Sequence, residues 1–82
     1  MQIANFAELD LSKIELPIIT VYFNTKDFPG KYVARLFEAP LPTKYHVVAD
    51  SLEEVRKSIP YGRFSRLDRS EVDDPVIVEI WI

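Results

Sequence analysis

The chain has 82 residues, of which 48% are hydrophobic and 12% aromatic, and its net charge is -3. We expect a single small domain over residues 1–82, because domains usually need roughly 100 to 200 residues. The apolar content excludes an intrinsically disordered chain. The acidic balance argues against a generic nucleic-acid coat, which would normally be basic.

The sequence contains no cysteine and no segment typical of a membrane helix. The absence of cysteine excludes disulfides, thiolate metal sites and a cysteine nucleophile. The nearly apolar run Val76–Ile82 is far shorter than the ~20 residues of a membrane helix. Met1–Phe6 has no cationic region followed by an apolar stretch, so we expect a cytoplasmic protein without a secretory signal.

Prolines and glycines divide the first half of the chain into two predicted strands. Residues 18–23 and 32–37 are rich in β-branched and aromatic side chains, which fit a half-buried pleated surface. Between them, Pro29 presets φ and Gly30 tolerates a positive φ, so residues 27–30 are predicted to form a turn. The pair is therefore expected to be a hairpin.

A third strand is predicted over residues 45–49, after a linker at 40–42 whose prolines cannot continue a ladder. A helix follows at once and is expected to stop at Pro60. Two capping boxes fit its start, namely Asp50 with Glu53 and Ser51 with Glu54. Its apolar stripe has the spacing i, i+3, i+7 and consists of Leu52, Val55 and Ile59.

The tail at 75–82 gives the strongest strand signal, because its residues are apolar on nearly both faces. Such a strand belongs near the middle of a sheet or against a partner. We expect one set of side chains to face the helices: Val76, Val78, Ile80 and Ile82. The other face is then expected to carry Ile77, Glu79 and Trp81.

At the N-terminus, Asn5 and Glu8 have capping-box spacing, which favours a short helical turn. The element order is then α-β-β-β-α-β. We predict an α+β fold with a small antiparallel or mixed sheet of about four strands and the helices on one sheet face.

The sheet face away from the helices is a candidate interaction surface. It is expected to carry Ile77 and Trp81, and exposed apolar patches tend to mark interaction sites. Alternatively, the segment 61–74 folds over this face. Phe28 at the hairpin tip either anchors a partner or tucks back onto the sheet, and we favour tucking back.

One basic feature stands out, since Arg63, Arg66 and Arg69 recur at a spacing of three. On a helix, the three guanidiniums would share a face and could bind phosphates. We favour internal ion pairs instead, because four carboxylates lie in the same stretch. These are Asp68, Glu71, Asp73 and Asp74.

No catalytic or cofactor site is evident in the sequence. His46 is the single histidine and has no neighbouring serine, so it lacks a nucleophile to activate and cannot hold zinc alone. The acidic cluster before the last strand lacks the spacing of a calcium loop. Gly30 and Gly62 are too far apart for a phosphate-binding loop. We therefore expect a protein that is not an enzyme and that has no metal or cofactor.

Several segments carry a resemblance to known proteins: Lys26–Arg35, Pro42–Thr43, Asp50–Arg56 and Asp73–Ile82. The chain resembles a group of small bacterial proteins of similar length without an assigned function. Ala49–Glu54 is also similar to the strand and helix start of HicB-type antitoxin domains. That likeness implies a β-β-β-α-β order, and neither resemblance supplies an activity that can be carried over to this chain.

Together these features predict a non-enzymatic interaction or regulatory module. Its partner is expected to be another protein or a second copy of the chain. The alternative is a nucleic-acid-linked or antitoxin-like regulator that uses Arg63, Arg66 and Arg69.

Overall fold

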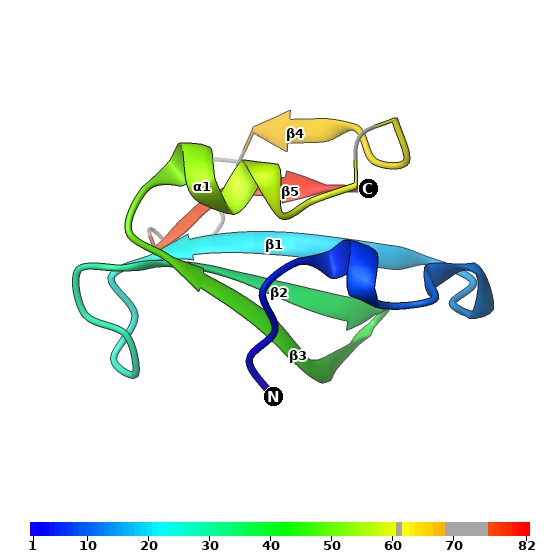
Figure 1. Cartoon of the computed structure of the whole chain (residues 1–82), viewed down its shortest axis with the longest axis horizontal. Helices are drawn as coiled ribbons and strands as arrows, with labels where there is room; N and C mark the ends of the chain where they lie inside the picture. Colours follow the sequence, from blue (N-terminus) through cyan, green and yellow to red (C-terminus); the bar gives the residue numbers. More distant parts are fainter. Residues whose placement is uncertain (61, 69–75) are drawn as a thin grey trace.

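A computed structural model of the chain describes residues 1–60, 62–68 and 76–82. In these residues, five strands form one antiparallel sheet in the order β3-β2-β1-β5-β4 (Figure 1). The strands are β1 (Pro17–Phe23), β2 (Tyr32–Glu38), β3 (Leu41–Ala49), β4 (Arg66–Asp68) and β5 (Ile77–Trp81). The α+β class is confirmed, whereas the expectation of about four strands was wrong.

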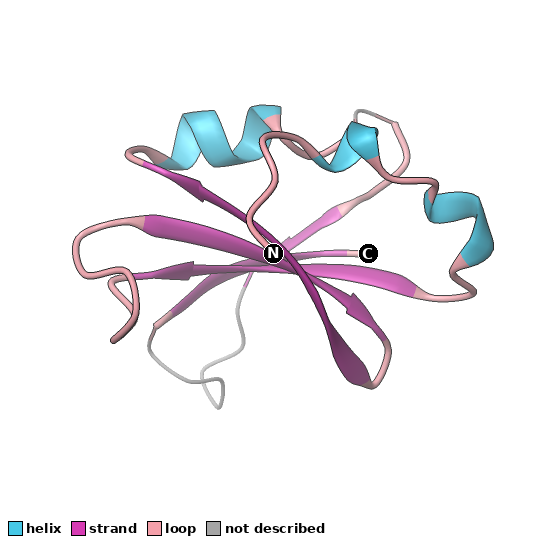
Figure 2. Cartoon of the chain, turned by 60° about the horizontal axis from the view of Figure 1, so that its bottom comes forward, coloured by secondary structure: helices cyan, strands magenta, loops and turns pink. Residues whose placement is uncertain are grey.

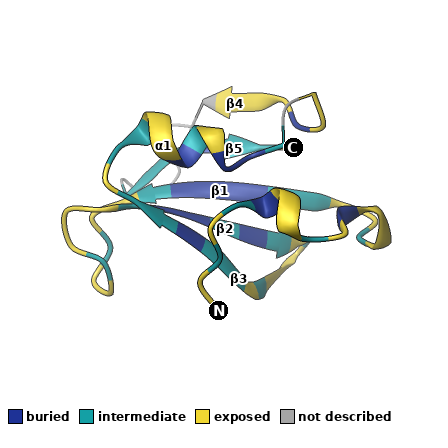
Figure 3. Ribbon diagram, viewed as in Figure 1, coloured by how far each residue is buried: buried dark blue, intermediate teal, exposed yellow. Residues whose placement is uncertain are grey.

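The helical elements all lie on one face of this sheet (Figure 2). They are the α-helix α1 (Leu52–Lys57) and two 3-10 turns, η1 (Phe6–Glu8) and η2 (Leu11–Lys13). The core fills the space between this layer and the sheet, and buried positions are concentrated in the middle strands (Figure 3). Among its fully buried side chains are Phe6, Ile19, Leu36, Val21 and Val55.

The start of α1 resolves the choice between the two predicted capping boxes. Ser51 is the N-cap, and its hydroxyl accepts a hydrogen bond of 3.1 Å from the Glu54 backbone N–H. Val55 and Ile59 are buried, as the predicted apolar stripe requires. The helix ends before Pro60, with Ser58 as its C-cap.

The N-terminal segment forms two short turns where the sequence predicted one. The capping box of Asn5 and Glu8 is confirmed at η1, and Asp10 caps η2. Before η1, Gln2 forms a parallel bridge with His46. This bridge covers part of the outer edge of β3.

β3 begins earlier than predicted, so the expected linker at 40–42 was wrong. Leu41 pairs with Glu38, and Pro42 pairs with Phe37 beyond an irregularity in the β2–β3 register. Proline is tolerated there because β3 is an edge strand, where a missing N–H need not break a ladder.

The sequence did not predict β4. Its three residues lie in a segment considered helical for the arginine hypothesis, yet Leu67 pairs with Ile80 on β5. A strand this short shows too little alternation to be recognised from sequence. Because β4 takes the edge, β5 lies inside the sheet between β1 and β4, as its apolar character predicted.

The predicted facing of β5 was wrong for three residues, since Ile80 pairs with Thr20 on the face away from the helices while Glu79 and Trp81 lie on the other face. Trp81 pairs with Ile19 and Glu79 pairs with Val21, so both lie on the helix-covered face. On this face, the Glu79 carboxylate accepts hydrogen bonds from Arg56 of α1, and this interaction explains why Glu79 faces the helices. When both faces of a strand are apolar, a single buried ion pair can determine which face lies under the helices.

An irregularity in the β1–β5 register separates Ile77 from the rest of the strand. Tyr22 pairs with Ile77, whereas Val21 pairs with Glu79, so Val78 is the extra residue. Val78 packs against the core, as expected, while Ile77 lies on the other face with Tyr22.

Among the described residues, the helices are too short or too polar for any of them to cross a membrane.

Candidate interaction surfaces

The sheet face opposite the helices carries three cross-strand rows of side chains. We call it the open face, because no helix covers it in the described part of the chain (Figure 2). The pairing register places the following residues on it: Val48, Val33, Tyr22 and Ile77; His46, Arg35, Thr20, Ile80 and Leu67; Pro42, Phe37 and Ile18.

The open face is mainly apolar and only its centre is buried. Val33 is 4% exposed and Thr20 is 7% exposed, because larger neighbours surround them. Val33 does not belong to the core cluster beneath the helices, which agrees with its place on the open face. Tyr22 and Phe37 are half-buried, and Leu67 at the β4 edge is exposed.

The polar groups of this face lie in the middle row. Arg35 donates a hydrogen bond of 3.3 Å to the Thr43 carbonyl. The Nδ1 atom of His46 is buried without a hydrogen-bond partner. Burial lowers the pKa of His46, and the positive charges of the N-terminus and Arg35 act in the same direction, against a backbone hydrogen bond at Lys44 that raises it.

The open face brings together two of the predicted interaction residues. The ring of Phe28 lies 5.6 Å from the ring of His46, so Phe28 tucks back onto the sheet instead of projecting. Ile77 lies beside Tyr22 on this face, as predicted. Trp81 lies on the helix side, away from both. The segment 62–68 does not fold over the face, and the rest of 61–74 lies outside the described residues.

On the helix side, a buried carboxylate connects three other side chains. Glu79 is 1% exposed. Its oxygens accept hydrogen bonds from Arg56 Nε at 3.2 Å, Arg56 Nη2 at 2.7 Å and the Trp81 indole N–H at 2.7 Å. Arg66 Nη1 approaches to 3.9 Å. Such donors compensate a carboxylate that has been removed from water.

Sequence reasoning missed this cluster, although it carried a signal. A glutamate in the middle of an apolar strand needs a cation when that strand is inside a sheet. Arg56 lies on the predicted helix but outside its apolar stripe of Leu52, Val55 and Ile59, so the stripe gave no reason to bring Arg56 to the last strand.

Arg63 and Arg66 do not share a helix face, because Arg63 lies in a turn and Arg66 lies in a strand. Arg66 belongs to β4 and pairs with Glu79, which agrees with internal pairing but uses a partner that was not predicted. Arg63 is exposed and lines a shallow hollow of about 600 Å³ beside Leu16 and Ile82. Arg69 lies outside the described residues. So do Glu71, Asp73 and Asp74, and the side chain of Asp68 is not described.

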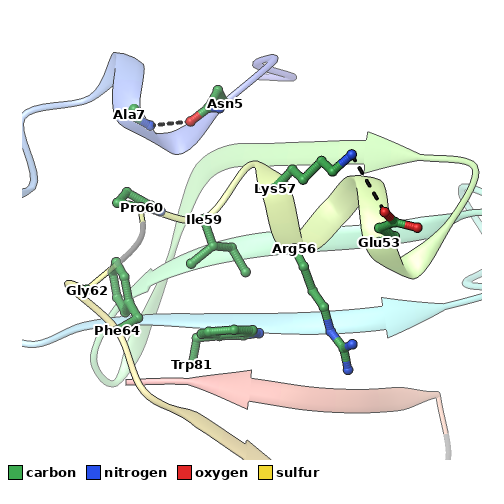
Figure 4. Close-up of a pocket in the computed structure, with 10 residues that line it drawn as sticks. All are labelled: Asn5, Ala7, Glu53, Arg56, Lys57, Ile59, Pro60, Gly62, Phe64 and Trp81. Atoms are coloured by element: carbon green, nitrogen blue, oxygen red, sulfur yellow. Dashed lines mark hydrogen bonds and ion pairs between the residues drawn. The ribbon is translucent and has the colours of Figure 1, made fainter.

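A second concave surface, which we call the Trp81 groove, lies between α1 and the turn that precedes β4. Its volume is about 590 Å³. Figure 4 shows charged side chains from α1 at one end and apolar side chains at the other. The groove is lined by Asn5, Ala7, Glu53, Arg56, Lys57, Ile59, Pro60, Gly62, Phe64 and Trp81.

The open face has one histidine, whose neighbours are an arginine and a phenylalanine. Within residues 1–60, 62–68 and 76–82, no three His, Cys, Asp or Glu side chains gather as a metal site would require.

Comparison with known proteins gives no match to a family model, to a curated protein or to a solved structure. The resemblances to small bacterial proteins and to HicB-type domains therefore stay predictions.

Proposed function

We propose that the protein is a non-enzymatic interaction module that binds another protein through the open face. The observation that carries this proposal is the set of three cross-strand rows, in which few polar groups interrupt apolar side chains. Burying such a surface yields about 25 cal/mol per Å² of apolar area, which favours association.

The composition of the open face supports a protein partner. Tyr22, Phe37 and Arg35 lie in adjacent rows, and interfaces are enriched in tyrosine, phenylalanine and arginine. These side chains stand on β1 and β2, the two longest-paired strands, so they are already fixed before a partner arrives. A fixed surface loses less conformational entropy on binding.

The test is affinity capture of the tagged protein from its own cell lysate after nuclease treatment, read by mass spectrometry. We compare the wild type with Phe37→Ser on the open face and with Leu16→Ser as a matched control. Leu16 is 56% exposed and lies outside the open face. We expect at least one protein to be retained by the wild type and by Leu16→Ser, and to be lost with Phe37→Ser.

Circular dichroism of each variant establishes that it is folded before capture. Retention of the same proteins by Phe37→Ser would contradict the proposal, as would loss of every partner on nuclease treatment. If only the chain itself is recovered, light scattering decides whether its mass exceeds 9.5 kDa. A larger mass that Phe37→Ser reduces would make a second copy the partner.

A further inference from the structure

We propose that the partner of the open face is a protein with an acidic contact surface, which places an aspartate or glutamate carboxylate, surrounded by apolar side chains, against Arg35. The inference rests on the proposed function of this face and names the chemistry of its partner. Three observations carry it. They are the single sign of charge on the face, the surroundings of the Arg35 guanidinium, and the poor fit of a second copy of the chain.

The open face is basic although the chain is acidic. The sequence has 13 aspartates and glutamates against 10 lysines and arginines. Among the described residues that the pairing register places on the open face, Arg35 and His46 are basic, and none is aspartate or glutamate. The nearby charges that act on His46, those of the N-terminus and Arg35, are both positive. This face therefore departs in sign from the rest of the molecule.

The guanidinium of Arg35 is surrounded by apolar side chains along its own strand. Arg35 is half-buried and lies on β2 between Val33 and Phe37, which share its face. Its Nη1 atom donates a hydrogen bond of 3.3 Å to the Thr43 carbonyl. The ion pairs of the described residues do not include Arg35. A guanidinium has five N–H donors, so donors remain for a ligand.

The carboxylate at the rim of the face nearest to the end of β3 is already paired. Asp50 follows β3 directly, and its carboxylate forms an ion pair with Lys31, which precedes β2. The charges of these two side chains cancel. The charge left on the face is therefore that of Arg35, with His46 beside it.

A partner that covers Arg35 must replace the water around its guanidinium. Val33 and Phe37 have no side-chain acceptors, so an apolar partner surface would leave a charge desolvated and uncompensated. An aspartate or glutamate compensates it best, because a carboxylate accepts two parallel hydrogen bonds from one guanidinium. The apolar rows would then supply attraction, and Arg35 would select the partner.

A second copy of the chain fits this face poorly. Two open faces packed against each other would bring basic side chains together, and the described residues of the face supply no carboxylate to separate them. Like charges in an interface disfavour association. The acidic partner is therefore a different protein.

The experiment is an mRNA-display selection of random peptides on the immobilised full chain. Peptides that also bind Phe37→Ser are removed first, so that those retained depend on the open face. We expect enrichment of aspartate or glutamate flanked by aromatic or aliphatic residues. The same selection on Arg35→Glu should instead enrich lysine and arginine, because this variant reverses the charge of the face.

Titration calorimetry with one selected peptide measures the contribution of Arg35. Arg35→Gln should weaken binding at least about ten-fold, because the peptide carboxylate loses its buried partner. Replacing that peptide residue by its amide should have a similar effect, and combining the two changes should cost less than their sum. Arg63→Gln is the matched control, since Arg63 is exposed and lies outside the open face. It should change the affinity less than about two-fold.

Four results would overturn the inference. These are the absence of Phe37-dependent peptides, peptides of this kind without enrichment of aspartate or glutamate, equal affinities of Arg35→Gln and Arg63→Gln, and a dimer in light scattering that Phe37→Ser dissociates. Circular dichroism shows whether each variant is folded. If Arg35→Glu is not, Arg35→Gln replaces it in the selection and should remove the acidic enrichment.

The lysate capture separates failure of this inference from failure of the proposed function. A captured protein that is lost with Phe37→Ser but retained by Arg35→Gln would leave the open face as the interaction surface and contradict its acidic partner. Retention of every captured protein by Phe37→Ser would contradict the proposed function itself.

Discussion

Among single residues, His46 combines burial with an unsatisfied nitrogen. Its Nδ1 atom has no hydrogen-bond partner, and its ring lies under Phe28 and beside Arg35. Burial and the nearby positive charges lower its pKa below the usual 6.5. The folded protein therefore accepts a proton at this ring less readily than the unfolded chain does.

We expect the free energy of unfolding to fall as the pH drops below about 6.5. The unfolded chain binds the His46 proton first, so stability is lost from that pH down to the lower pKa of the folded state. Urea unfolding at pH 7.5, 6.5 and 5.5 measures this. His46→Gln should flatten the dependence over this range, and an unchanged slope in that variant would contradict the assignment.

For single residues, the sequence predicted the placement of some side chains and not of others. Of the two alternatives for Phe28, the favoured one, tucking back onto the sheet, is confirmed, and Ile77 lies on the predicted face. Trp81 was misplaced because alternation gives two equivalent choices when both faces are apolar. Its role depends on Glu79 and Arg56, which are 23 residues apart and meet only in the folded chain.

Among the elements, β5 shows how a polar pair determines strand facing. A slip of one residue would exchange its two apolar sides at little hydrophobic cost, yet it would move Glu79 away from Arg56. Buried ion pairs add little net stability over apolar replacements, and their best-attested use is to select one register. We attribute the facing of β5 to this pair.

Arg56→Ala should lower the free energy of unfolding by about 3 kcal/mol, because it removes two hydrogen bonds from the buried carboxylate of Glu79. Glu79→Ala should lower it by less, because the Arg56 side chain is 40% exposed and reaches water. The double variant should lose less than the sum of the two. Urea unfolding of all four proteins gives the coupling. Lys57→Ala is the control, since its exposed pair with Glu53 should change stability by less than about 0.5 kcal/mol. Additive losses would refute the coupling.

Local signals predicted most element starts, because capping chemistry is a matter of neighbours in the chain. Ser51 and Asn5 are examples. β4 and the first half of β3 could not be predicted in the same way. Each depends on a partner strand, β5 for β4 and β2 for β3. Tertiary pairing overrides weak local preference in such segments.

For the whole molecule, the helical layer is made of pieces that are too short to be stable alone. α1 has 6 residues, and η1 and η2 have 3 each, whereas isolated helices need at least about 12 to 15. They are held by the core, and the Phe6 backbone N–H donates to the Ser58 carbonyl at 2.9 Å. The layer and the sheet should therefore unfold together.

Phe6→Ala should lower the free energy of unfolding by about 3 to 5 kcal/mol, because the ring is fully buried in the core. Denaturant unfolding followed by far-UV circular dichroism and by Trp81 fluorescence should give one common midpoint. Leu16→Ala, at an exposed position, should change stability by less than about 0.5 kcal/mol. Separate midpoints for the two signals would contradict joint unfolding.

The order of elements differs from the prediction, because one strand was missed and one helical turn proved to be two. The order of strands in the sheet was not predictable, because it depends on which strands far apart in the sequence pair with each other. β1 lies at the centre with β2 and β5 on either side, so the first and last thirds of the chain meet there.

The polar cluster around Glu79 bears on which residues of the domain can be substituted without changing its fold. The ion pair that determines the facing of β5, between Glu79 and Arg56, lies beneath the helices. The side chains of the open face do not belong to this pair. Substitutions at Ile18 or Phe37 on the open face should then leave strand order and facing unchanged. The residues that determine the facing of β5 and the residues of the open face are therefore two separate sets.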